Sequence, residues 1–217
     1  MTYPVPVGQP DAPAPTPKPL WLRSLITTAI LVAALFVIEF IDAATRFDLD
    51  DNGIEPRELG GLDGIIWAPL LHADWAHLFA NLIPGVVLCF LLLMTQRFLI
   101  VTGIVWLVSG LGVWLFAPPY TITVGASGVI FGWLAFLLIR GLFNRDLWQV
   151  LGGVVLFLIY GSLLWGVLPT DSSVSWQAHL FGAIGGVLAA WYLAERDRRK
   201  KAKSDNGAGG RVPGVAS

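Results

Sequence analysis

Residues 98–117 read FLIVTGIVWLVSGLGVWLFA, a run without a single charged side chain. A helix needs about twenty apolar residues to cross the hydrocarbon core of a bilayer. Five further runs of similar character lie to either side of this one. The six runs cover residues 22–42, 77–95, 98–117, 124–140, 147–168 and 177–194. Because only helices and closed barrels satisfy their backbone in lipid, and none of these runs alternates, the sequence predicts six transmembrane helices.

The overall composition supports this interpretation. Hydrophobic residues make up 55% of the chain and charged residues 13%, about half of the roughly 25% charged residues in soluble domains. A net charge of -1 without an interior basic stripe argues against a nucleic-acid-binding protein. One cysteine, Cys89, excludes a disulfide scaffold and a cysteine-based zinc site. The predicted fold class is therefore an all-α polytopic membrane protein.

Two tails flank the apolar region. Residues 1–21 contain seven prolines between positions 2 and 19 and predict a disordered tail. Residues 22–194 form the predicted membrane domain, and residues 195–217 are basic and then Gly-rich, which predicts a second solvated tail. The first run could also be read as a signal peptide, but its length and its acidic end, at Glu39 and Asp42, disfavour cleavage there.

The distribution of basic residues predicts the orientation. With six spans, twelve of the fourteen lysines and arginines fall on the side of the two termini, and only Arg46 and Arg57 fall on the other. The positive-inside rule then places both termini in the cytoplasm. We expect a multi-pass protein of the cell (plasma) membrane. Its long loop between the first two spans, residues 43–76, would be outside.

The fourth predicted span opens with small residues around a serine. Ser127 lies near the outer start of the span, and Gly128 and Gly132 are four residues apart, a pattern that lets another helix approach closely. On its own, this serine also fits a simple packing face.

The sixth span carries a matching stripe. His179, Gly182 and Gly186 lie at i, i+3 and i+7 on one helix face. His179 enters the membrane at the same predicted depth as Ser127, so glycine-to-glycine packing of the two helices would bring these side chains together. A serine beside a histidine is an activated nucleophile and its base. His179 alone also fits a hydrogen-bonding role at a helix end, but the coincidence of depth and stripes favours a Ser–His dyad.

The second span adds a possible oxyanion hole. His77 and Asn81 lie at i and i+4 on one face, and both can donate hydrogen bonds to a developing oxyanion. The backbone N–H of Ser127 would add a third donor. His72 lies just before this span and fits a structural role equally well. His72 and His77 are five apart rather than four, and no H-E-x-x-H motif is present, so we expect no metal.

Together these segments resemble the rhomboid family of intramembrane serine proteases. The resemblance rests on GASGVIFG at 125–132, on His72, His77 and Asn81 at H-x4-H-x3-N spacing, and on A-H-x-x-G-x-x-x-G at 178–186, and it spans about residues 22–194. It implies a six-helix rhomboid-like bundle. Ser127 would be its nucleophile, His179 its base, and His77 and Asn81 its oxyanion hole. The resemblance gives supporting positions to Phe131, which would pack on the histidine, and to Gly125, Gly128, Gly182, Gly186 and His72.

The implied activity is a serine endopeptidase that cleaves single-pass membrane proteins near the outer membrane face, without cofactors. Two alternatives stay open at this point. A rhomboid-like protein without catalysis would bind membrane helices. A small transporter would use polar groups inside the membrane, such as Glu39. The sequence does not indicate the oligomeric state.

Overall fold

The computed structural model describes residues 17–45, 48–169 and 174–209. Most of the Pro-rich tail and the last residues of the C-terminal tail lie outside these ranges. The elements in chain order are α1 (Leu20–Ala44), η1 (Leu49–Asn52), η2 (Leu59–Gly61), α2 (Gly64–Trp67), η3 (Ala68–Leu70), α3 (Trp75–Met94), α4 (Phe98–Phe116), α5 (Ser127–Asn144), α6 (Leu147–Tyr160), η4 (Gly161–Val167) and α7 (Trp176–Gly209).

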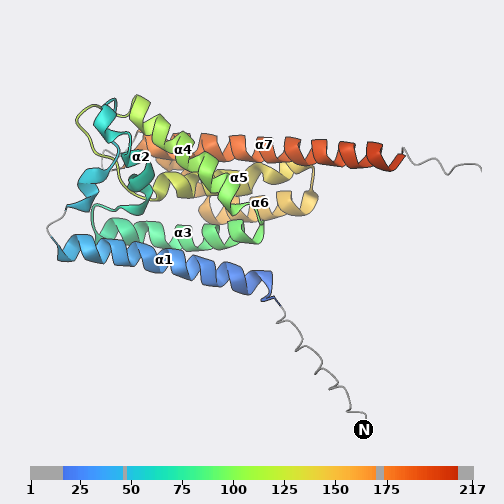
Figure 1. Cartoon of the computed structure of the whole chain (residues 1–217), viewed down its shortest axis with the longest axis horizontal. Coiled ribbons are helices and arrows are strands. Elements are labelled where there is room, and N and C mark those ends of the chain that lie inside the picture. Colours follow the sequence, from blue (N-terminus) through green and yellow to red (C-terminus); the bar gives the residue numbers. More distant parts are fainter. Residues whose placement is uncertain (1–16, 46–47, 170–173, 210–217) are drawn as a thin grey trace, which may run out of the picture.

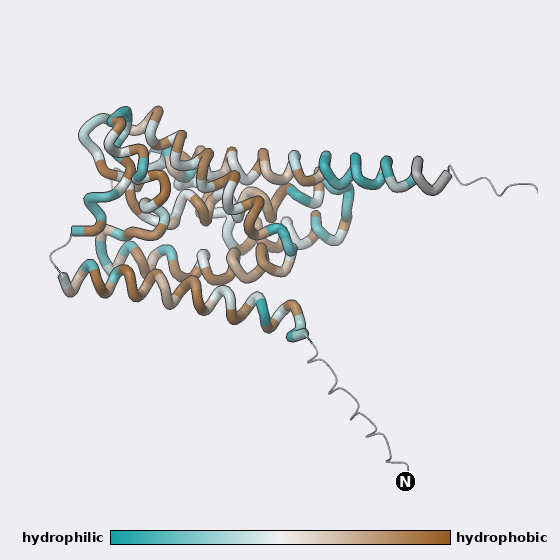
Figure 2. The backbone as a smooth tube through the Cα atoms, viewed as in Figure 1, coloured by the Kyte–Doolittle hydropathy of each residue, from teal (hydrophilic) through white to brown (hydrophobic). Residues whose placement is uncertain are grey.

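Six of these segments are long and apolar enough to cross a membrane: α1, α3, α4, α5, α6 continued by η4, and α7. The predicted all-α polytopic fold is confirmed. The spans run alongside one another, and α1 begins at the same end of the bundle at which α7 finishes (Figure 1). Hydrophobic residues cover the spans, while the turns of α7 that follow residue 194, up to residue 205, are hydrophilic (Figure 2).

The core lies around α5. This helix makes its most extensive contacts with α7, and α4 also packs along α7. Leu134 on α5, Val105 on α4 and Ala189 on α7 are completely buried. By contrast, α6 is exposed along most of its length. The buried α5 therefore meets neighbours on several sides, which fixes its position more firmly than that of the peripheral helices.

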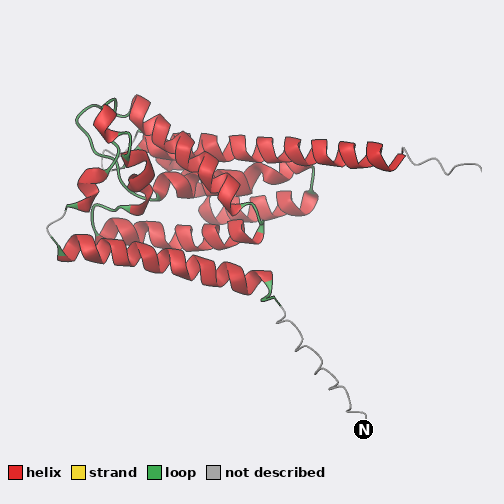
Figure 3. Ribbon diagram, in the orientation of Figure 1, coloured by secondary structure: helices red, strands yellow, loops and turns green. Residues whose placement is uncertain are grey.

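The loop between α1 and α3 folds over one end of the bundle. It pairs through an isolated β-bridge between Ile54 and Thr123, and the described residues contain no strand (Figure 3). The indole of Trp106 on α4 donates a 2.7 Å hydrogen bond to the carbonyl oxygen of Ile65, which is buried. This loop is thereby tied to α4 and to the chain that leads into α5.

Several helix boundaries differ from those expected from hydropathy, and three of them have a visible polar cause. Because Thr123 pairs with Ile54, the chain before Gly125 is extended and α5 begins at Ser127 rather than near residue 124. Asp74 caps α3, which therefore begins at Trp75. The last helix runs past residue 194 to Gly209, and Glu195 pairs with Arg198 and Arg199 one turn later, contacts that favour helix.

Candidate active site

The turn into α5 strongly favours glycine. Gly125 has a φ of 113°, a conformation that other residues rarely adopt. Its N–H donates a 2.8 Å hydrogen bond to the carbonyl oxygen of Ala68. A Cβ atom at this position would lie 2.6 Å from Cε1 and Nε2 of His77. The turn therefore holds the His77 ring against the backbone two residues before Ser127.

The imidazole of His179 is held from two sides. Its Nδ1 lies 2.8 Å from the carbonyl oxygen of Gly166, in η4. Since a carbonyl oxygen only accepts, Nδ1 carries the proton and Nε2 keeps its lone pair. The ring also stacks on Phe131, with 4.0 Å between centroids and 2° between planes. With 6% of its surface exposed, His179 is a buried base whose free nitrogen has a fixed direction.

Glycines bring the helices of Ser127 and His179 together. A Cβ atom at Gly182 would overlap the carbonyl group of Gly128, and one at Gly186 would overlap that of Gly132. No side chain therefore separates α5 from α7 where these four glycines meet. Ser127 precedes Gly128, and the carbonyl oxygen of Ala178 lies 3.0 Å from the Cβ position of Gly128. The predicted nucleophile is thus at the level of α7 that carries His179, although no Ser127–His179 hydrogen bond forms among the described residues.

The first two turns of α3 present two further predicted residues, His77 and Asn81. Asp74 Oδ1 accepts a 2.7 Å hydrogen bond from the N–H of His77, which fixes the start of the helix. Asn81 is 8% exposed, and its Nδ2 donates to the carbonyl oxygen of His77 at 3.0 Å. One hydrogen of the Asn81 amide is used inside the helix, and the other has no partner among the described residues.

His72 contacts His77 and is 2% exposed. Neither of its ring nitrogens has a hydrogen-bond partner within the described part of the chain. Its ring meets that of His77 edge-on, with 5.2 Å between centroids. Burial, and then the charge of His77, lowers the pKa of His72 to about 4. His72 is therefore neutral near pH 7 and supports His77 by contact.

These residues do not assemble a metal site. Across the described ranges, no group of three or more histidine, cysteine, aspartate or glutamate side chains is placed to hold a metal ion. What the arrangement offers is a serine, a base of fixed tautomer and several hydrogen-bond donors at one end of a helical bundle.

A comparison with known protein families shows where this architecture belongs. The family model for the Rhomboid domain matches residues 60–196. The chain belongs to the rhomboid family. The resemblance inferred from the three sequence segments is thereby confirmed, and the matched region includes α3 to the membrane part of α7.

Relatives of this rhomboid protein occur in bacteria and in a parasite. It is 44% identical over 215 residues to an uncharacterised protein of Mycobacterium tuberculosis, covering 94% of this chain and 90% of the relative. It is 30% identical over 187 residues to a candidate rhomboid protease of Bacillus subtilis, covering 82% and 93% of the two chains. It is 32% identical over 148 residues to rhomboid-like protease 5 of Toxoplasma gondii, covering 64% of this chain and 17% of the relative.

Three contacts at the site could not be read from the sequence. The carbonyl of Gly166 orients His179, the carbonyl of Ala68 holds Gly125, and Ser109 Oγ donates to the carbonyl oxygen of Ala178 at 2.9 Å. Each of the three contacts uses a backbone carbonyl oxygen on one side, which any residue type supplies. Ser109 gave a weak signal as a polar residue inside an apolar span.

Proposed function

We propose that this rhomboid protein is a serine endopeptidase that cleaves transmembrane-helix substrates through a Ser127–His179 dyad. The observation that carries the proposal is the state of His179. Its Nδ1 is bonded to the carbonyl oxygen of Gly166, and its ring stacks on Phe131. His179 lies on α7, whose glycines pack against those of α5, the helix that begins with Ser127. A buried histidine held in this way is suited to take a proton at Nε2.

The proposed reaction proceeds through an acyl-enzyme. Nε2 of His179 takes the proton of Ser127 as Oγ attacks the scissile carbonyl carbon, and then gives that proton to the leaving amine. Water, activated by the same nitrogen, hydrolyses the ester and restores Ser127. This chemistry requires no metal and no cofactor.

Three groups would stabilise the oxyanion. The free N–H of the Asn81 amide, the imidazole of His77 and the backbone N–H of Ser127 would donate to it. The last of these lies at the start of α5, where N–H groups lack partners within the helix. Gly125 supports this arrangement, because its lack of a side chain leaves room for His77.

The proposed substrates are single-pass membrane proteins, cut near the outer face. Arg97, Arg140 and Arg145 lie at the end of the bundle opposite Ser127, as do the basic residues late in α7. By the positive-inside rule that end is cytoplasmic, with both termini, and the site opens to the extracytoplasmic side of the plasma membrane.

The test is cleavage of a panel of single-pass proteins in vesicles with purified wild type, Ser127→Ala and His179→Ala. Ser162→Ala, which alters an exposed serine outside the site, is the matched control. We expect wild type and Ser162→Ala to cleave and the other two variants to be inactive. Cleavage that persists in Ser127→Ala would refute the dyad. Substrate binding without cleavage by any variant would favour a helix-binding role instead.

A further inference from the structure

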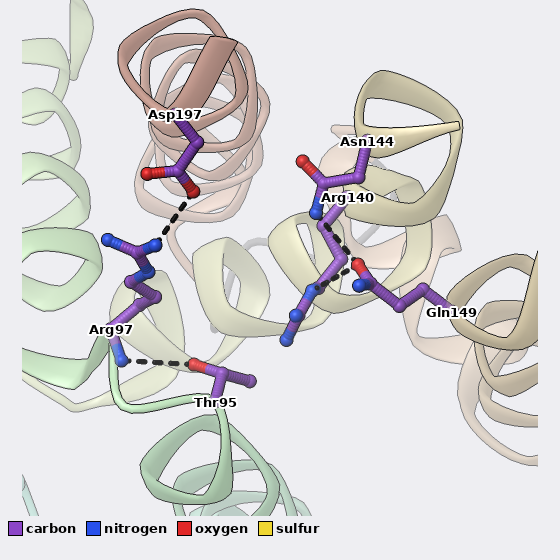
Figure 4. A network of polar contacts seen from close by, with 6 residues as sticks. All are labelled: Thr95, Arg97, Arg140, Asn144, Gln149 and Asp197. Carbon is purple, nitrogen blue, oxygen red and sulfur yellow. Dashed lines mark hydrogen bonds and ion pairs between the residues drawn. The ribbon is translucent and has the colours of Figure 1, made fainter. Parts of the chain in front are cut away.

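A polar cavity lies at the end of the bundle opposite Ser127. It has a volume of about 210 Å³ and is bounded by the turn between α3 and α4 and by α5, α6 and α7. Its polar residues come from four separate segments, as Figure 4 shows: Thr95, Arg97, Arg140, Asn144, Gln149 and Asp197. None of them takes part in the proposed peptidase reaction.

The two arginines of this cavity are bound differently. Arg97 forms a 2.7 Å ion pair with Asp197. Arg140 donates from Nε to Gln149 Oε1 at 2.9 Å and lies over the ring of Phe136, with 5.6 Å from Cζ to the centroid. Among the described residues, Arg140 has no salt bridge, and its terminal amino groups have no hydrogen-bond partner.

Asp146, an acidic residue close to Arg140 in sequence, is already engaged. Asp146 accepts hydrogen bonds from the backbone N–H groups of Trp148 and Gln149 and from the side-chain amide of Gln149. It therefore caps α6 and does not pair with Arg140. The polar residues that line the cavity carry two positive charges and one negative charge, so the cavity retains one positive charge.

This arrangement suits a phosphodiester. An unpaired cation in a partly buried site is costly, and an anion there offsets that cost. The planar guanidinium presents paired donors that match phosphate oxygens. A single negative charge would balance the single unpaired positive charge of the cavity.

Apolar side chains exposed nearby indicate that this anion carries acyl chains. Leu99, at the start of α4, is 83% exposed, and Leu147 and Trp148, at the start of α6, are 68% and 81% exposed. These residues lie at the same end of the bundle as the cavity, where tryptophan commonly marks the membrane interface. Basic pockets between transmembrane helices on the cytoplasmic side bind lipid head groups in other proteins.

We propose that this cavity binds the phosphodiester of an anionic phospholipid, with Arg140 as its main ligand and Arg97 as its second. The bound lipid links the start of α4 to α5 and α7. Asp197 competes with the lipid for Arg97. The site is independent of the proposed peptidase activity.

Binding is tested by native mass spectrometry of the full chain in neutral detergent, with phosphatidylglycerol, phosphatidylcholine or inorganic phosphate added. We expect preference for phosphatidylglycerol. Arg140→Gln should weaken it about tenfold or more, since the variant loses a charge-assisted hydrogen bond to the phosphodiester. Arg145→Gln is the matched control, because it removes the same charge at the same end outside the cavity, and it should bind like wild type.

Asp197→Asn keeps the test decisive if Arg140→Gln fails to fold. Removing the competing carboxylate should tighten phosphatidylglycerol binding several-fold, a gain that misfolding cannot mimic. Equal binding of the two lipids would overturn the proposal, as would equal losses in Arg140→Gln and Arg145→Gln, or unchanged binding in Asp197→Asn. Inorganic phosphate binding as tightly as the lipid would overturn the assignment to a phospholipid.

Discussion

Replacing Gly182 with alanine should greatly reduce the proposed peptidase activity by separating α5 from α7. The added Cβ would lie 2.8 Å from the carbonyl carbon of Gly128 and nearer still to its oxygen. Carbon atoms in contact are ordinarily about 3.5–4.0 Å apart, so the helices must move by about 1 Å. Ser127 is the residue before Gly128, and His179 is one turn before Gly182. A misplacement of about 1 Å at reacting groups can cost about 100-fold in rate.

Two other glycines provide matched controls for this substitution. A Cβ at Gly103 on α4 or at Gly152 on α6 would meet nothing within 4 Å. Alanine favours helix over glycine by about 1 kcal/mol, so Gly103→Ala and Gly152→Ala should be as stable as wild type or more so. The assay is the rate of cleavage in vesicles for the three variants, with thermal unfolding as a check on folding. Activity of Gly182→Ala within about threefold of the controls would refute the argument from helix contact.

Three further results are expected. Asn81→Ala should lower the rate of cleavage by about 100-fold without abolishing it, since one of the proposed oxyanion donors would be lost and the others would remain; an unchanged rate would remove Asn81 from the proposed site. Asp74→Ala should lower the free energy of unfolding by about 1 kcal/mol, as expected for loss of the α3 cap, measured by denaturation against wild type. The pKa of His72 falls from 6.5 to about 4 on folding, so the unfolded chain binds more protons between these values. The contribution of His72 to the free energy of unfolding should therefore be fully present above pH 6.5. It should fall by up to roughly 3 kcal/mol as the pH drops toward 4. His72→Leu should flatten that dependence, and an equal slope in both proteins would contradict it.

Hydropathy predicted the six spans because the bilayer requires long apolar runs. It could not predict where polar forces set the ends. The capping of α3 by Asp74 and the bridge between Ile54 and Thr123 depend on hydrogen bonds that hydropathy does not measure. The extension of α7 beyond residue 194 depends on helix propensity and on ion pairs of Glu195, which act in water as well as in lipid.

The candidate site was partly accessible from sequence because two helices carry matching glycine stripes. The stripes predicted that α5 and α7 approach closely. The structure agrees with that packing, because a Cβ atom at Gly182 would overlap the carbonyl group of Gly128. The orientation of His179 was not accessible, because its partner is the backbone carbonyl of Gly166, thirteen residues away in η4. The roles of Ser127 and His179 stay predictions until they are tested.

The most direct measurement is to treat the protein in lipid vesicles with a fluorophosphonate and map the modified residue by mass spectrometry. An activated serine is attacked without any knowledge of its natural substrate. We expect one adduct in wild type, on Ser127, none on Ser109, the α4 serine bonded to the carbonyl oxygen of Ala178, and none on Ser127 in His179→Ala. A folded wild-type protein that forms no adduct, or an adduct that forms equally without His179, would contradict the proposed dyad.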